Sequence, residues 1–163
     1  MPDIRGDLPE TLDGLTIRKA TAADVYDLVA MMIDDDLGKQ REVLSDPLPE
    51  GYLRAFAAID SDPRHELIVV EREGAVVATA HITYLPGLSY QGAWRALIES
   101  VRVTAALRSH GIGAAMMHWA IARSRAKGCH VLQLTTHKSR LNAHRFYARL
   151  GFVASHEGMK LTL

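Results

Sequence analysis

A glycine-rich turn between a strand-like run and a helical run is the feature of this sequence that points most directly to chemistry. The turn, called the glycine turn below, reads Arg108-Ser109-His110-Gly111-Ile112-Gly113, and it joins the runs 96–103 and 114–122. The first N–H groups of a helix have no partner inside the helix, and the helix dipole adds partial positive charge there. The turn therefore predicts an anion-binding site, which Gly111 and Gly113 would let a ligand approach closely.

The spacing of the glycine turn narrows the kind of anion site. Arg108 can add a charge-assisted contact to a phosphate, so the composition favours a pyrophosphate. A dinucleotide fingerprint needs a third glycine where this chain has Met116, and a Walker loop needs a Gly-Lys-Ser/Thr step that the turn lacks. Two glycines at a helix start are also a common turn solution, and this simpler interpretation stays open.

An R-x-x-G-x-G turn after the Val101-x-Val103 strand resembles the acetyl-CoA signature of the GCN5-related N-acetyltransferase (GNAT) superfamily. The resemblance covers most of the chain and implies an α/β (α+β) fold. Its centre would be a mixed, mostly antiparallel, twisted sheet of about seven strands, flanked by about four helices and split between the fourth and fifth strands.

Hydrophobic periodicity places the other elements around the turn. Thr21 or Asp24 can cap the first helix, and Gly151 ends the last one. The last helix carries Ala143, Phe146, Tyr147 and Leu150 at helical spacing. The expected strands are 16–20, 65–70, 75–84, 96–103, 131–135, 152–155 and 159–163, and the helices begin near residues 25, 51, 114 and 143.

Composition limits the classes of partner. The 163 residues predict a single domain, 1–163, and the 19 basic residues equal the 19 acidic ones, so no nucleic-acid partner is expected. No apolar run approaches the ~20 residues that span a bilayer, so no membrane partner and a cytoplasmic location are expected. The lone Cys129 favours inert burial.

Acetyl transfer to an amine needs a base, a stabilised carbonyl oxygen and a proton for the leaving thiolate. Glu99 lies in an otherwise apolar strand, where a carboxylate must be satisfied or functional. The resemblance implies that Glu99 is the base, acting through water; the alternative is a structural pair with Arg95 or Arg102. Strict alternation would put Glu99, Val101 and Val103 on one face, although relatives bulge here.

The resemblance implies the remaining roles. Tyr147 matches the tyrosine that protonates coenzyme A thiolate, and main-chain N–H groups near Val101–Val103 would face the acetyl carbonyl. The usual pantetheine asparagine is replaced by Arg140, and the nearest asparagine is Asn142. The implied acetyl-CoA-binding residues are Val101, Arg102, Val103, Arg108, Ser109, His110, Gly111, Ile112, Gly113, Ala114 and Asn142.

The resemblance implies that the segment 31–51 forms one wall of the acceptor site. Its carboxylates Asp34–Asp36 could hold an ammonium group or could simply be solvated. His137 and His144 could approach each other, but no metal-ligand spacing occurs, so no metal is expected. His81, His137 and Tyr84 are candidates for the acceptor pocket or an alternative base, and each has a structural interpretation as well.

The sequence therefore predicts an acetyl-CoA-dependent N-acetyltransferase that acts by direct attack of a primary amine in a ternary complex. The branch it resembles most favours a small molecule of the amino sugar, amino acid or polyamine type. The alternatives are a protein lysine or N-terminal acetyltransferase, an enzyme for longer acyl groups, and a non-catalytic acetyl-CoA-binding sensor. Relatives often dimerise through late strands, so 159–163 would contribute to a homodimer.

Overall fold

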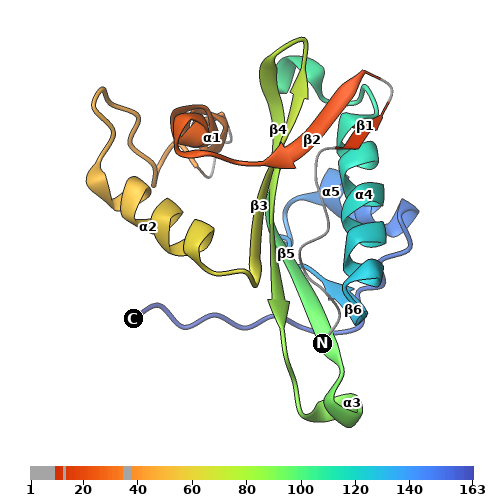
Figure 1. Ribbon diagram of the computed structural model, residues 1–163. Coiled ribbons are helices and arrows are strands. Elements are labelled where there is room, and N and C mark those ends of the chain that lie inside the picture. Colours follow the sequence, from red (N-terminus) through yellow and green to blue (C-terminus); the bar gives the residue numbers. More distant parts are fainter. Residues whose placement is uncertain (1–9, 13, 35–37) are drawn as a thin grey trace.

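The computed structural model describes residues 10–12, 14–34 and 38–163 (Figure 1). The strands are β1 (Glu10–Leu12), β2 (Leu15–Lys19), β3 (His65–Arg72), β4 (Ala75–Leu85), β5 (Trp94–Val103) and β6 (Cys129–Gln133). The helices are α1 (Val25–Ile33), α2 (Glu50–Ser61), α3 (Ser89–Gly92), α4 (Ile112–Ala126) and α5 (Leu141–Arg149). One-turn 3₁₀ segments at Ala22–Asp24 and Ala105–Leu107 stand before α1 and before the glycine turn.

The described strands form one sheet in the order of the sequence, β1 to β6. Neighbours from β1 to β5 are antiparallel, whereas β6 is parallel to β5, so the mixed, mostly antiparallel sheet is confirmed. The β5–β6 pairing begins at Trp94 with Cys129 and reaches Leu97 with Gln133, while β5 itself continues to Val103. The expected split between the fourth and fifth predicted strands is therefore the divergence of β5 from β6.

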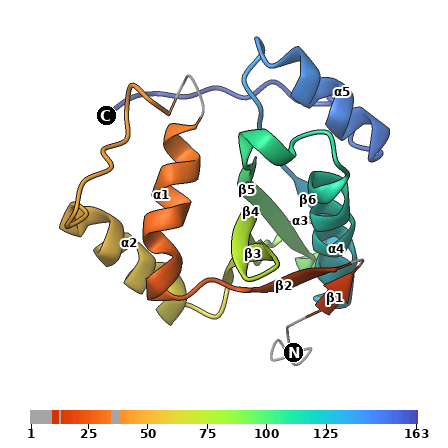
Figure 2. The ribbon, with the colours of Figure 1, turned by 90° about the horizontal axis from the view of Figure 1, so that it is seen from above.

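The helices cover both faces of the sheet. Seen from above, α1 and α2 lie on one side and α4 and α5 on the other (Figure 2). Alternation in β3 explains both layers, because Ile68 and Val70 pack in the large core beneath α4, whereas Val69 packs against α1. Met116 and Met117 of α4 are fully buried in the large core. The middle of β3 thus carries apolar side chains on both faces.

Two expected strands at the C-terminal end are wrong. The structure assigns no strand to 152–155 or 159–163, and it contains β1 and α3, which the sequence pattern did not indicate. The side chains of Met159, Leu161 and Leu163 are almost fully exposed. Their alternation imitates a half-buried strand, but a strand also needs a partner edge, which a local pattern does not specify. The homodimer expected through this segment stays a prediction.

Arg18 of β2 anchors the start of α1 to the sheet. Its guanidinium donates to both carboxylate oxygens of Asp24 at 2.8 Å and to Glu71 of β3 at 2.6 Å. Asp24 also accepts the backbone N–H of Thr21 at 2.6 Å, so the cap expected at Thr21 or Asp24 is confirmed. The Arg18 guanidinium lowers the pKa of the Asp24 carboxyl to about 2. Burial acts in the opposite direction and is outweighed, and the contacts with Thr21 lower the pKa further. This carboxylate is therefore ionised at any physiological pH.

Glu66 of β3 anchors α4 to the opposite face. Its side chain is 2% exposed and accepts from Arg123 at 2.7 Å, Lys127 at 3.2 Å and the Tyr84 hydroxyl at 2.8 Å. Burial raises the pKa of the Glu66 carboxyl, but Arg123, Tyr84 and Lys127 together outweigh burial and leave that pKa lowered. The two cations at the end of α4 are thus neutralised by a carboxylate that stays ionised.

We expect Glu66→Ala to lower the free energy of unfolding by about 3–5 kcal/mol, because Arg123 and Lys127 would keep buried charge without a counter-ion. Glu50→Ala is the matched control, since Glu50 pairs with Arg54 in a highly exposed i,i+4 pair, and should cost at most about 0.5 kcal/mol. Urea denaturation of both variants measures the difference.

The pH dependence supplies a second readout of the same prediction. A carboxyl whose pKa is lowered by folding contributes stability above its unfolded pKa and loses it as the pH falls through the folded value. The wild type should therefore lose stability as the pH falls below 4.5, the ordinary pKa of a glutamate carboxyl. Glu66→Ala should lose less stability over that range. Equal losses in Glu66→Ala and Glu50→Ala would contradict the anchoring role.

Candidate functional site

The alternation of side chains between the two faces of the sheet is interrupted in β5 at Ser100. This residue has φ +51°, which is rare for a residue with a side chain, and the register with β4 shifts at the same place. Ile98 before the bulge is buried in the core beneath α4, and Val101 and Val103 after it pack against that same core. Glu99 consequently lies on the other face. The expectation of Glu99, Val101 and Val103 on one face is wrong because Ser100 adds one residue to the strand.

Glu99 lies on the α1–α2 face, in register with His81 of β4. The Glu99 side chain is exposed, so it needs no counter-charge to be stable. Its apolar neighbours in the sequence suggested a buried carboxylate that would need a partner, and this expectation is wrong. An exposed carboxylate on this face can accept a proton from a ligand or a water molecule. The position is compatible with the role of a base and does not require a structural ion pair.

The end of β5, the start of α4 and α5 meet at Gly113. A Cβ atom built on Gly113 would lie 3.4 Å from Cγ2 of Val103 and 3.6 Å from Cζ of Phe146. The side chain of Tyr147 follows directly in α5 and belongs to the same core. Residues expected to bind the cofactor and to protonate the thiolate are therefore brought together from three separate elements. They converge beyond Leu97, where the pairing of β5 with β6 has ended.

The glycine turn has the backbone of an anion site. Ser109 has φ +67° and Gly111 has φ +84°, and Gly111 immediately precedes α4. The first helical bond runs from the Ala115 N–H to the Gly111 carbonyl at 2.9 Å. The N–H groups of Ile112, Gly113 and Ala114 precede this bond, so they are the helix-start donors that an anion can use.

Arg108 is held by the end of α1. Its Nε donates to the Val103 carbonyl at 3.1 Å and its Nη2 to the Asp34 carboxylate at 3.0 Å. The same carboxylate accepts the Ala105 N–H at 3.0 Å. Asp34 therefore fixes the approach to the glycine turn, a role that the sequence did not predict because 71 residues separate it from Ala105. Asp35 and Asp36, the other candidates for holding an ammonium group, lie outside the described residues.

His110 and Asn142 are exposed polar residues beside this region. The His110 Nδ1–H donates to the Arg108 carbonyl at 2.8 Å. The Asn142 amide oxygen accepts from Arg145 one turn further along α5. Both contacts are local, one within the glycine turn and one within the first turn of α5.

Tyr147 is half-buried between two aromatic rings. Its ring packs edge-on against Phe146 and Phe152, with centroid distances of 5.2 and 5.8 Å. Burial raises the pKa of the hydroxyl, an effect that nearby Arg140 partly offsets. The phenol is therefore protonated at neutral pH and can act as a hydrogen-bond donor and an acid.

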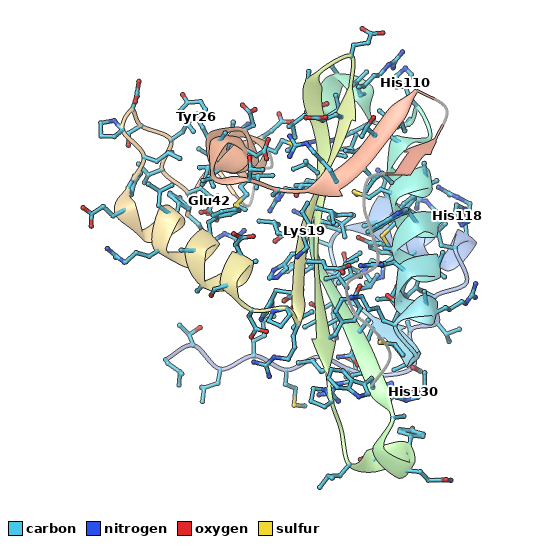
Figure 3. All side chains as sticks on the ribbon, viewed as in Figure 1. Lys19, Tyr26, Glu42, His110, His118 and His130 are labelled. Atoms are coloured by element: carbon cyan, nitrogen blue, oxygen red, sulfur yellow. The ribbon has the colours of Figure 1, made fainter. Side chains whose placement is uncertain are left out.

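The histidines do not gather at one place in the fold. His110, His118 and His130 lie at different heights on the α4 side of the sheet (Figure 3). His144 contacts the carbonyl of His137 at 3.1 Å, so this expected approach occurs. Across the described ranges, no three His, Cys, Asp or Glu side chains are placed to hold a metal ion. Burial raises the pKa of the Cys129 thiol, which keeps it protonated.

Among the described helices, none is long and apolar enough to cross a membrane. Residues 31–152 match the model of the acetyltransferase (GNAT) family. The aminoalkylphosphonate N-acetyltransferase of Salmonella typhimurium strain LT2 is 28% identical over 143 residues, which are 86% of each chain.

Two solved structures add to the comparison. A protein of Bacillus halodurans C-125, described as a transcriptional regulator, is 48% identical with a TM-score of 0.89, over 91% of this chain and 99% of that one. Glucosamine-6-phosphate N-acetyltransferase of Arabidopsis thaliana is 21% identical with a TM-score of 0.74, over 94% and 99%. At that identity the plant enzyme shows a shared fold.

We expect Gly111→Ala to lower the free energy of unfolding by about 1–2 kcal/mol, because a left-handed residue strains a side chain even where space is free. Gly51→Ala is the matched control: Gly51 lies in α2, and a Cβ atom there also meets nothing within 4 Å. It should raise stability by about 0.5–1 kcal/mol. Chemical denaturation measures both, and equal effects would show that Gly111 does not need its left-handed conformation.

Proposed function

The chain belongs to the acetyltransferase (GNAT) family, and from this premise we propose that it transfers the acetyl group of acetyl-CoA to the primary amine of a small molecule. One observation carries the proposal. The glycine turn presents the N–H groups of Ile112, Gly113 and Ala114 where β5 has already parted from β6. A phosphate group at the turn would leave the rest of an extended ligand free to run along the open edge of β5.

The residues of the turn fit the diphosphate of acetyl-CoA. Helix-start N–H groups and the partial positive charge of α4 suit an anion, and Gly111 and Gly113 add no side chain to the approach. Arg108 would serve mainly by holding the turn in place, because its Nε already donates to Val103 and its Nη2 to Asp34. Main-chain groups of Val101–Val103 would contact the pantetheine arm. Bound acetyl-CoA supplies an acetyl group activated as a thioester.

Two side chains would supply the acid and base chemistry. The Glu99 carboxylate would take a proton from the acceptor ammonium group through water, which frees the nitrogen lone pair to attack the carbonyl carbon. The Tyr147 hydroxyl would donate its proton to the departing sulfur, and the second proton that the attacking nitrogen loses would restore the hydroxyl. Main-chain N–H groups beside Val101 would stabilise the charge that develops on the carbonyl oxygen.

The proposed acceptor is a small amine of the amino sugar, amino acid or polyamine type. The Salmonella relative, which is named for an aminoalkylphosphonate substrate, supports this class at 28% identity. A lysine side chain or a peptide N-terminus carries the same reactive group, so a screen for coenzyme A release should include peptides beside amino sugars, polyamines and aminoalkylphosphonates. Release with peptides alone would replace the small-molecule assignment.

A second candidate function is a non-catalytic acetyl-CoA sensor. The observation that favours it is the 48% identical protein of Bacillus halodurans, which is described as a transcriptional regulator. The equal numbers of basic and acidic residues do not suggest a DNA-binding surface on this chain. Retention of both Glu99 and Tyr147 favours the enzyme.

Isothermal titration tests the cofactor assignment. We expect saturable heat with acetyl-CoA and none with ATP or NAD at the same concentrations, because the glycine turn lacks the spacing of nucleotide motifs. Binding of all three ligands would indicate a general phosphate site. A wild-type protein that does not bind acetyl-CoA would overturn the proposal.

Tyr147→Phe separates the enzyme from the sensor. An enzyme should lose at least about tenfold in kcat, since the proton for the sulfur is removed, while the Kd for acetyl-CoA changes little. The control is Tyr90→Phe, which alters an exposed tyrosine in α3 at the far end of the sheet (Figure 1). Unchanged kcat in Tyr147→Phe would show that Tyr147 is not the acid.

A further inference from the structure

Two histidines of the β3–β4 hairpin share a hydrogen bond on the α1–α2 face. The Nδ1 atom of His65 and the Nε2 atom of His81 lie 2.9 Å apart, and the ring centroids lie 5.0 Å apart. Both residues are half-buried. A contact of this length between two imidazoles requires that one ring donates and the other accepts. The pair therefore holds a proton in a defined position.

The pair belongs to a row of polar groups that crosses the sheet. His81 is in register with Glu99 of β5, and side chains directly opposite in antiparallel strands have Cβ atoms about 5 Å apart. A carboxylate and an imidazole at this spacing reach each other directly or through one water molecule. On the far side, the Nε2 atom of His65 lies 4.0 Å from the Asp62 carboxylate. The row thus runs from Glu99 through His81 and His65 to Asp62.

The charges along the row are complementary. Burial, and secondarily the charge of His65, lowers the pKa of His81 to about 4, so this ring is neutral at neutral pH. Arg64 lowers the pKa of Asp62 to about 2, so this carboxylate is ionised. Thr83 adds a hydroxyl 3.2 Å from Nδ1 of His65. A positive charge that reached His65 would therefore face a permanent negative charge, whereas one on His81 would not.

One arrangement of protons pairs the two rings and leaves Nδ1 of His81 unprotonated. The Nε2–H of His81 donates to Nδ1 of His65, and the Nε2–H of His65 points toward the Asp62 carboxylate. The remaining lone pair, on Nδ1 of His81, is then free to accept a proton. Because Glu99 lies opposite His81 on β5, this lone pair can accept the proton that Glu99 takes from the acceptor.

We propose that His81 and His65 form a proton relay that carries the proton of the acceptor ammonium group from Glu99 to solvent beside Asp62. The inference rests on the proposed function. The Glu99 carboxyl passes its proton to Nδ1 of His81, and the Nε2 proton of His81 passes to Nδ1 of His65. The Nε2–H of His65 is then released to water, so that one proton enters the row and one leaves it. Exchange with water restores the starting tautomers between turnovers.

The relay predicts a specific kinetic loss in His81→Asn and His65→Asn. We expect kcat to fall at least about tenfold, while KM for the amine and Kd for acetyl-CoA stay within about twofold, because neither residue lies at the glycine turn. The loss should be largest at low pH and shrink as the pH rises, since a free amine needs no proton removed. His118→Asn, an exposed histidine of α4 on the opposite side (Figure 3), should behave as the wild type.

Two further measurements separate a relay from a structural contact. Free imidazole should restore part of kcat to His81→Ala, which a purely structural role would not allow. Asp62→Asn keeps an acceptor for Arg64 and removes the charge, so it should lower kcat in the same pH range and remain informative where a histidine variant fails to fold. Wild-type kcat across the pH range in these variants would overturn the relay.

Failure of the relay and failure of the proposed function give different results. A wild-type protein that releases no coenzyme A with any amine overturns the function and the relay with it. An active wild type with unaffected His65 and His81 variants overturns the relay alone. Nitrogen chemical shifts of the two imidazoles report the shared proton without any assay. The relay requires the same tautomer on both rings, Nε2–H at rest, and opposite tautomers on His65 and His81 would contradict the shared hydrogen bond.

Discussion

The candidate site depends on the pairing of β5 with its two neighbouring strands, and the two pairings differ in direction and in length. β4 holds β5 along its length in an antiparallel register, whereas β6 is parallel and stays paired through Leu97. Beyond that point no described strand pairs with this edge of β5. An extended ligand can use main-chain groups only at such an edge, because a fully paired strand has none to offer. The roles proposed for the glycine turn therefore depend on the divergence of β5 from β6.

Each layer of helices is fastened to the sheet by a carboxylate–guanidinium contact. On one face Arg18 ties α1 to β2 and β3 through Asp24 and Glu71, and on the other Glu66 of β3 receives Arg123 of α4. These contacts lie at the start of α1 and the end of α4. The opposite ends of the same two helices are joined by Asp34, which holds Arg108 and Ala105. The glycine turn is thus positioned from both layers at once.

The sequence predicted those parts of the fold that local patterns determine. The period of apolar residues located α1, α2, the β3–β4 hairpin and β5 to within a few residues, and the glycine turn located the start of α4. The C-terminal strands failed for the opposite reason, because Met159, Leu161 and Leu163 alternate correctly but nothing local provides a partner edge. The facing of Glu99 failed because the φ of Ser100 depends on the register with β4, which no spacing within β5 reveals. The contact of Asp34 with Arg108 and the pairing of His65 with His81 were missed because the partners lie on other elements of the fold.

The bulge at Ser100 also explains how the two halves of the chemistry come to lie on different faces. Without it, Glu99, Val101 and Val103 would share one face, so either the carboxylate would be desolvated in the core beneath α4 or the two valines would leave that core. With it, the apolar residues after the bulge pack beneath α4, near Gly113 and Phe146, while Glu99 is exposed next to His81. The proposed acid, Tyr147, and the proposed base, Glu99, are then on opposite faces of the sheet. If an amine and a thioester meet at this edge of β5, the base would act from one face and the acid from the other, and each side chain would keep its own environment.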